Sequence, residues 1–87
     1  MEKYKEIFEL RNELEKRNIP FQFKQRDDGW QIFIKHIDNC ICDVIQAQYS
    51  YGLEFMDDTP ANKDVEVKGY LNVAKAVELI EEVINRQ

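Results

Sequence analysis

The stretch FQFKQRDDGWQIFIKHIDNCICDVIQA, residues 21–47, carries the clearest structural signal of the chain. Its first run alternates apolar and polar side chains, as a strand with one buried face does. The second run also alternates, with one strongly apolar face and one mixed face. The letters DDG and DN between the runs are typical turn residues. The sequence therefore predicts an antiparallel meander with strands at residues 21–26, 30–37 and 40–47.

The third of these predicted strands is apolar on both of its faces. One face carries Cys40, Cys42 and Val44, and the other carries Ile41, Ile45 and Ala47. Antiparallel sheets usually bury one face and leave the other in water. A chain of 87 residues forms one modest core, so the second apolar face is a candidate binding surface.

Two amphipathic helices are predicted to flank the meander. The first spans residues 2–17 and ends where Asn18 can adopt the left-handed conformation and Pro20 prevents continuation. The second follows Asn72, a suitable N-cap, and runs almost to residue 87. The apolar faces consist of Tyr4, Ile7, Phe8, Leu10 and Leu14 in the first helix and of Val73, Ala76, Val77, Ile80, Val83 and Ile84 in the second.

The segment between the third strand and the second helix has weaker patterns. Residues 53–56 fit either a short fourth strand or a helical turn, and residues 57–64 have the composition of a loop. Residues 65–67 alternate over too short a length to define an element. The predicted fold class is α+β, a single domain over residues 1–87. It contains a three- to four-stranded antiparallel meander with both helices on one face, in the order α-β-β-β-(β)-α.

The net charge of −5 is distributed unevenly along the chain. Residues 1–26 carry +2, residues 27–66 carry −7, and residues 67–87 are neutral overall. The acidic middle would repel phosphate backbones and attract a basic protein surface, so we expect no nucleic-acid partner. The alternative is that these aspartates are simply turn residues. No apolar run approaches the ~20 residues that cross a membrane, and the charged N-terminal segment predicts a cytoplasmic protein without membrane contact.

The sequence predicts no enzyme, no metal site and no cofactor. His36, Cys40, Cys42 and Asp43 are ligand-type residues, but the C-x-C spacing differs from the paired motifs of structural zinc sites. No nucleophile elbow or glycine-rich phosphate loop is present. A disulfide between such close cysteines would be strained, so we expect two reduced and partly buried thiols.

Arg11 lies within the apolar stripe of the first predicted helix rather than opposite it. In one interpretation its stem packs on the core and its head reaches water. In the other, the guanidinium lies under the sheet and pairs with Asp43 or with a bound anion.

The candidate interface lies on the sheet face that the helices leave open. Aromatic side chains with polar tips and exposed apolar patches are typical of interfaces. An alternative is that the segment after Gly52 folds over this face. The predicted interface residues are Phe33, Ile41, Ile45, Tyr49 and Tyr51.

Several short motifs together resemble a known group of proteins. The motifs are IPF at 19–21, GWQI at 29–32, CDVI at 42–45, YSYG at 49–52, LEFM at 53–56 and GYLNVAKAVELI at 69–80. They resemble small uncharacterised proteins encoded by phages and prophages of Gram-positive bacteria, over nearly the whole length. That group has a glycine-rich insert after the Tyr-Gly pair and often a histidine where this chain has Ala47, and both are absent here. The resemblance implies an accessory role in phage–host biology in the cytoplasm of a bacterial host, and it supplies no reaction.

Two hypotheses about function follow. The first is a non-catalytic interaction protein that docks on a host protein, a phage protein or a second copy of itself through the open sheet face and the acidic middle. The second is a small-ligand binder that holds a nucleotide-like molecule in a cleft lined by Arg11, Trp30, Tyr49 and Tyr51, where aromatic stacking and one cation would provide recognition.

Overall fold

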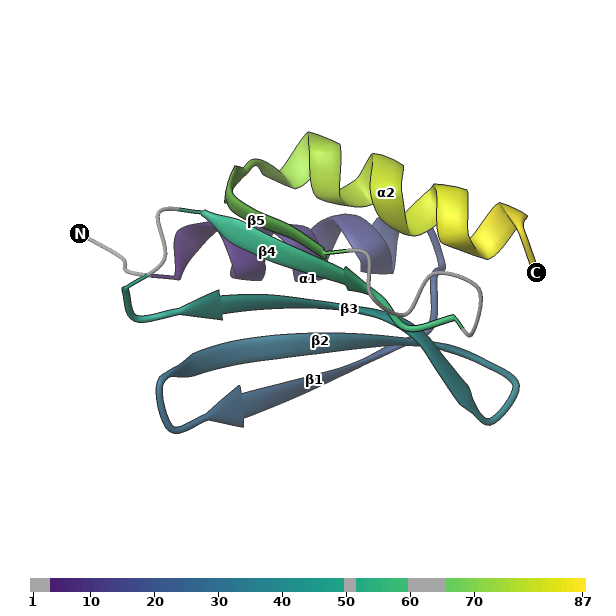
Figure 1. Cartoon of the computed structure of the whole chain (residues 1–87), viewed down its shortest axis with the longest axis horizontal. Coiled ribbons are helices and arrows are strands. Elements are labelled where there is room, and N and C mark those ends of the chain that lie inside the picture. The colour runs from purple at the N-terminus through teal and green to yellow at the C-terminus, as the bar shows by residue number, and fades with distance from the viewer. Residues whose placement is uncertain (1–3, 50–51, 60–65) are drawn as a thin grey trace.

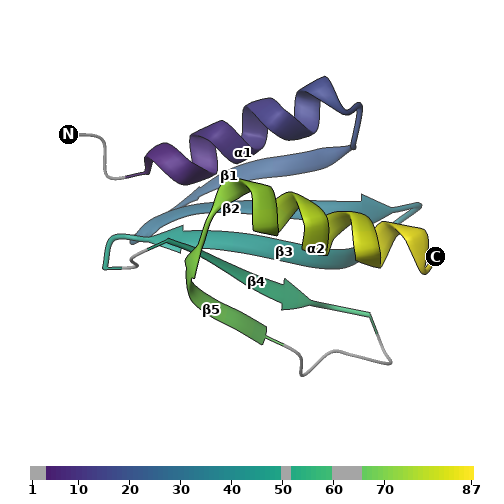
Figure 2. The same cartoon turned by 90° about the horizontal axis from the view of Figure 1, so that it is seen from above.

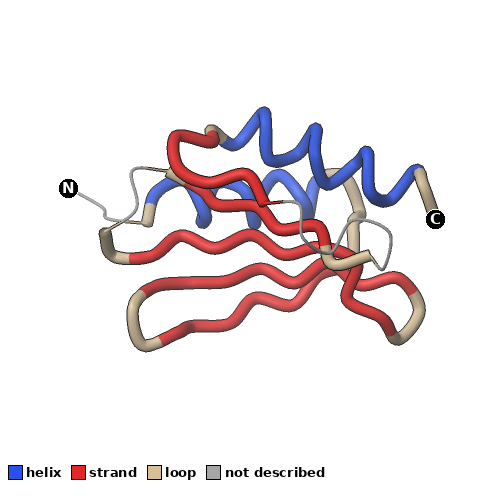
Figure 3. Tube along the Cα trace, viewed as in Figure 1, coloured by secondary structure: helices blue, strands red, loops and turns tan. Residues whose placement is uncertain are grey.

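The computed structural model describes residues 4–49, 52–59 and 66–87 as two helices and one sheet (Figure 1). The sheet has five strands, drawn in red in Figure 3, and each strand pairs antiparallel with the next in the order β1-β2-β3-β4-β5. The elements are α1 (Lys5–Lys16), β1 (Phe21–Arg26), β2 (Gly29–His36), β3 (Asn39–Ala47), β4 (Leu53–Asp57), β5 (Glu66–Leu71) and α2 (Val73–Asn85).

The predicted α+β fold class is confirmed, and the sheet is one strand larger than expected. The stretch 53–56 forms a strand rather than a helical turn, because β4 continues the meander along the free edge of β3. The last strand, β5, includes residues whose alternation was too short to define an element. It is stabilised by pairing with β4, for example between Phe55 and Val67.

Both helices lie on the same face of the sheet (Figures 1 and 2). Helix α1 contacts β2 and β3, whereas α2 contacts β3 and β4, and the two helices also contact each other. Their apolar stripes and one face of the sheet enclose the core. Its fully buried large side chains are Ile7, Leu10, Leu14, Ile32, Ile34, Cys42, Val44, Leu53, Ile80 and Val83.

Local signals explain where the helices begin and end. Asn18 has the expected left-handed conformation, with φ 57°, and the amide of Ile19 donates to the carbonyl of Leu14 at 3.0 Å. This pattern is the Schellman motif, which satisfies the last carbonyls of α1. Asn72 caps α2 as predicted, because its side chain accepts a hydrogen bond from the amide of Lys75 at 2.8 Å.

The first turn of α1 is capped from the sheet. Gln46 is buried among the helices, and its Oε1 accepts from the amide of Ile7 at 3.0 Å. Its Nε2 donates to the carboxylate of Glu6 at 2.7 Å, and this bond is the main cause of the lowered pKa of Glu6. Gln46 therefore satisfies a helix amide that no local side chain caps.

The hairpin between β1 and β2 requires Gly29. A Cβ at this position would lie 2.1 Å from the carbonyl oxygen of Gln46 and 2.8 Å from the Cα of Ala47. Both are backbone atoms of the paired strand β3, so a side chain could be accommodated only by moving the strands apart. The predicted turn glycine is thus also fixed by its close contact with β3.

A β-bulge in β3 changes the predicted faces of this strand. Ile34 pairs with Cys42 and Lys35 pairs with Cys40, so Ile41 is an extra residue without a partner of its own. The prediction that Ile41 lies exposed beside Ile45 is therefore wrong, since Ile41 is 5% exposed and belongs to the core. It lines a pocket of about 290 Å³ whose wall includes Gln87.

Candidate functional site

Among the side chains that the structure describes, the face of the sheet opposite the helices carries three large, half-buried apolar ones, Phe33, Ile45 and Met56. They alternate along their strands with buried residues of the helix-facing side. Residues 53–57 extend the sheet as β4 and do not fold over this face, as one interpretation of the sequence had suggested. These three residues define what we call the open-face patch.

A carboxyl group lies at the centre of this patch. Asp43 pairs across the sheet with Phe33 on β2 and with Met56 on β4, so it lies between two apolar side chains. It is 6% exposed although it belongs to the open face. Gln31 donates a hydrogen bond to its Oδ2 at 3.0 Å. A buried carboxyl group next to apolar side chains is energetically costly unless it is paired or protonated.

The electrostatic surroundings of Asp43 favour its protonated form. Burial, together with the hydrogen bond to Asp58 and the charge of Asp58, raises the pKa of Asp43 to about 7. The hydrogen bond from Gln31 and the charge of Arg26 act in the opposite direction. Within the part of the chain that the structure describes, neither carboxyl group forms an ion pair with a lysine or arginine. Asp43 and Asp58 thus form a carboxyl pair that is suited to share a proton.

The thiol of Cys40 lies next to this carboxyl pair. Its Sγ donates to Asp58 Oδ2 and to the carbonyl of Cys42, both at 3.5 Å. Burial and the charge of Asp58 raise the pKa of Cys40 to about 11, and burial also raises the pKa of Cys42. Both cysteines are free thiols. Because the thiolate is the nucleophilic form, Cys40 is poorly suited to nucleophilic chemistry near neutral pH.

The described basic and acidic side chains of the open face lie on different strands. One cross-strand row runs from Lys24 on β1 through Gln31 and Ile45 to Glu54 on β4. The basic Lys24 lies 5.6 Å above the ring of Phe33, and Lys35 is also exposed on β2. The carboxyl groups of Asp43, Glu54 and Asp58 lie on or beside β3 and β4. Among the side chains that the structure describes, the basic ones of this face thus lie on β1 and β2 and the acidic ones on or beside β3 and β4.

The structure assembles the predicted interface only in part. Phe33 and Ile45 lie together on the open face, as expected, whereas Ile41 is in the core. Tyr49 is 85% exposed in the turn after β3. Tyr51 lies outside the described residues. The residue that the sequence analysis missed is Met56, which belongs to the strand whose existence it left open.

Arg11 and Trp30 take part in packing on the helix side of the sheet. The rings of Trp30 and Phe23 are stacked, with centroids 4.7 Å apart and planes at 7°. The guanidinium of Arg11 lies 5.0 Å from the ring centroid of Phe8 and 5.2 Å from that of Phe23. The suggested pairing of Arg11 with Asp43 is wrong, because Asp43 belongs to the opposite face. The Trp30 ring, on which a ligand was expected to stack, is thus already packed against Phe8 and Phe23.

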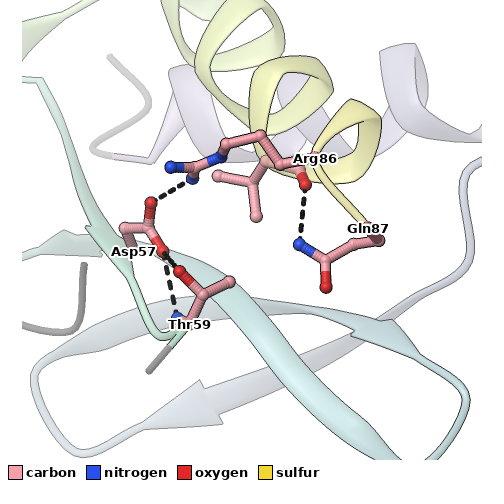
Figure 4. Close-up of polar contacts among 5 residues, drawn as sticks. Asp57, Thr59, Arg86 and Gln87 are labelled. Carbon is pink, nitrogen blue, oxygen red and sulfur yellow. Dashed lines mark hydrogen bonds and ion pairs between the residues drawn. The ribbon is translucent and has the colours of Figure 1, made fainter. Parts of the chain in front are cut away.

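A second buried carboxyl group lies on the helix side of the neighbouring strand (Figure 4). Asp57 is 3% exposed and forms an ion pair with Arg86 at the end of α2. It also accepts hydrogen bonds from the amide of Thr59 at 3.0 Å and from its hydroxyl at 2.6 Å. Burial raises the pKa of Asp57, but the hydrogen bonds from Thr59 and Arg86 outweigh it and leave the pKa below its usual value. This group holds α2 against β4.

Two further observations concern membranes and metals. Neither helix in the described ranges combines the length and the apolar character that crossing a membrane requires. Among the same residues, no three histidine, cysteine or acidic side chains converge as metal ligands.

Comparisons of the chain with protein-family models, with curated proteins and with solved structures found no match.

Proposed function

We propose that the protein is a non-catalytic interaction module that binds a protein partner through the open face of its sheet. The observation that carries this proposal is the burial of Asp43 at the centre of an apolar patch, where it forms no ion pair with any described lysine or arginine. Perturbed carboxyl groups of this kind are concentrated at functional sites. A partner that covers the patch would bury Phe33, Ile45 and Met56 and surround them with a polar rim, as interfaces do.

The chemistry of the face restricts the partner. Its surface must be apolar at the centre, acidic where it meets Lys24 and Lys35, and basic where it meets Asp58. The phage context predicted from the sequence adds host and phage proteins to the candidate partners, beside a second copy of this chain. The ligand-binding alternative is less favoured, because Trp30 and Arg11 are engaged with Phe8 and Phe23.

The proposal is tested by placing a charge in the patch. Ile45→Glu introduces a carboxylate into the open-face patch, and Asn12→Glu adds the same charge on an exposed position of α1. We expect Ile45→Glu to abolish association, measured by sedimentation for self-association and by affinity capture for other proteins, while Asn12→Glu leaves both unchanged. Circular dichroism establishes that both variants are folded. Unchanged association of a folded Ile45→Glu variant would exclude the open face as the interface.

A further inference from the structure

We propose that the pocket of about 290 Å³ beside Ile41 binds a primary alkylammonium group, the end group of small amines and of lysine side chains. The pocket lies between the β2–β3 hairpin, the end of β4 and the residue that follows α2. This inference goes beyond the proposed function, because none of the three residues of the open-face patch lines the pocket. It is carried by a carboxylate and an apolar side chain that meet in one cavity.

The chain's own hydrogen bonds hold the walls of the pocket in place. The amide of Asp58 donates to the carbonyl of Ile41 at 2.9 Å, which joins the end of β4 to the bulge of β3. Thr59 is held by its two hydrogen bonds to Asp57, and Gln87 donates through its Nε2 to a carbonyl of α2 at 2.9 Å (Figure 4). The pocket is therefore formed before a ligand arrives, as small-molecule sites commonly are.

Asp58 gives the pocket a negative charge. Its carboxylate is half-buried, and its Oδ2 accepts from the thiol of Cys40 at 3.5 Å, which is a weak donor. Within the described ranges no lysine or arginine forms an ion pair with Asp58. His36 also lines the pocket, is exposed, and opposes a cation only when it is protonated. A cationic N–H donor forms a stronger hydrogen bond with a carboxylate than a neutral donor does, which favours a positively charged ligand.

The contacts of this carboxylate favour an ammonium group over a guanidinium group. A guanidinium binds a carboxylate best through two parallel hydrogen bonds to both oxygens. Here Asp58 Oδ2 already accepts from Cys40, and the group also shares a hydrogen bond with Asp43. An ammonium group is a compact point charge that needs only one acceptor position.

The rest of the pocket favours a short alkyl chain next to the charge. The side chain of Ile41 lines the cavity, and methylenes that pack against it leave water, which is favourable. The volume of about 290 Å³ is at the lower limit of ligand pockets, which span about 300–1,000 Å³. The ligand is therefore a short alkylammonium rather than a nucleotide-sized molecule.

A titration of the wild-type chain with three probes tests the proposal. The probe n-butylamine has both the charge and the alkyl chain, n-butanol has the chain without the charge, and methylamine has the charge without the chain. Amide NMR spectra are recorded at constant ionic strength and at pH 8, where Asp43, with a pKa of about 7, is largely ionised. We expect n-butylamine to cause saturable shifts at Cys40, Ile41, Asp58 and Thr59 and to bind about tenfold more tightly than either other probe.

Two matched variants assign the binding to the carboxylate. Asp58→Asn removes the charge and keeps the shape of the side chain, whereas Asp38→Asn removes an exposed acid from the β2–β3 turn. We expect Asp58→Asn to weaken n-butylamine binding by about tenfold and Asp38→Asn to leave it unchanged. The dispersion of the amide spectra establishes that both variants are folded. A lack of saturable shifts with n-butylamine, equal binding of n-butanol, or undiminished binding by folded Asp58→Asn would overturn the inference.

A fourth probe, lysine with both backbone ends blocked, distinguishes the two sources of the ammonium group. Shifts at the same amides would assign the pocket to a lysine side chain of a protein, and binding of n-butylamine alone would assign it to a free amine. Both results support an ammonium site. The proposed function is tested separately, because Ile45→Glu changes the open-face patch and should leave amine binding unchanged.

Discussion

Asp43 and Asp57 are buried carboxyl groups on neighbouring strands, and their surroundings are opposite. Asp57 faces the helices, where Arg86 and Thr59 donate hydrogen bonds to it. Asp43 belongs to the other face, where Gln31 is its donor and Asp58 is a second acid. The pKa of Asp57 is accordingly held below its usual value, while that of Asp43 is raised to about 7.

The contrast separates a structural site from a candidate functional one. The fold itself supplies the partners of Asp57, so the charge of this residue stabilises the native state. Among the described residues Asp43 forms no ion pair, and the charge of Arg26 does not offset its burial, so burial of this residue costs stability whenever it is ionised. Buried carboxyl groups with a raised pKa are concentrated at functional sites, which is the reason for proposing an interaction surface around Asp43.

The largest expected effect on the free energy of unfolding is at Asp57, the structural site. Asp57→Ala removes the ion pair and both hydrogen bonds from Thr59, and we expect it to lower the free energy of unfolding by about 2–3 kcal/mol. The loss should stay at the lower end of the range for buried pairs, because the Arg86 side chain is 44% exposed and remains hydrated. Urea unfolding at pH 7 measures it.

The control for this substitution is Asp27→Ala, which removes an exposed aspartate from a turn. It should change the free energy of unfolding by no more than about 0.5 kcal/mol. Equal effects at positions 27 and 57 would contradict a structural role for the Asp57 site.

The second prediction is that a substitution of Asp43 increases stability relative to the wild type, by an amount that depends on pH. Burial and, after it, Asp58 raise the pKa of Asp43 from 3.8 to about 7 on folding, against the lowering effects of Gln31 and Arg26. The folded state therefore binds more protons, and wild-type stability should fall as the pH rises from about 4 to about 7. Asp43→Asn removes this titration while retaining an oxygen that can accept from Gln31.

We expect the stability of Asp43→Asn relative to the wild type to increase over that pH range by on the order of 1–2 kcal/mol and then to level off. Urea unfolding of both proteins at pH 4, 6 and 8 measures the difference. A difference that is independent of pH would show that Asp43 is ionised as easily as a carboxylate in water.

The smallest expected effect concerns the neighbour of this carboxyl pair. Asp58→Asn removes a negative charge that raises the pKa of Cys40 and retains an amide oxygen that can still accept from the thiol. We expect the Cys40 pKa to fall from about 11 by less than about one unit, since burial is the larger cause and persists. The pH dependence of alkylation by iodoacetamide, followed by mass spectrometry, reports this shift.

Cys42 is the internal control, because its side chain is fully buried and should react only on unfolding. An unchanged pH profile for Cys40 in Asp58→Asn would mean that Asp58 does not contact the thiol in solution.

Local patterns accounted for most of the fold. The alternation in residues 21–47, the Asn18 stop and the Asn72 cap all depend on neighbours within a few residues, and each was predictable. The bulge at Ile41 was not, because it depends on how β3 registers with β2. Strand β5 was also missed, since its few residues are held in the sheet by pairing with β4.

The candidate site was predictable only where it depends on strand alternation. Phe33 and Ile45 follow from the period of two along β2 and β3. The different surroundings of Asp43 and Asp57 do not follow from this period, because Arg86 lies 29 residues from Asp57 in sequence. The available signal was the doubly apolar third strand, which indicated a second apolar face, although one of its isoleucines is in the core.

The central proposal is that a protein partner binds the sheet face that carries Asp43 and not the outer surface of the helices. The most direct measurement is a set of amide NMR spectra of the full chain, recorded over a dilution series. We expect concentration-dependent shifts to cluster at Phe33, Asp43, Ile45 and Met56 and to be absent from the exposed positions of α1 and α2. Shifts confined to the helices would contradict this claim.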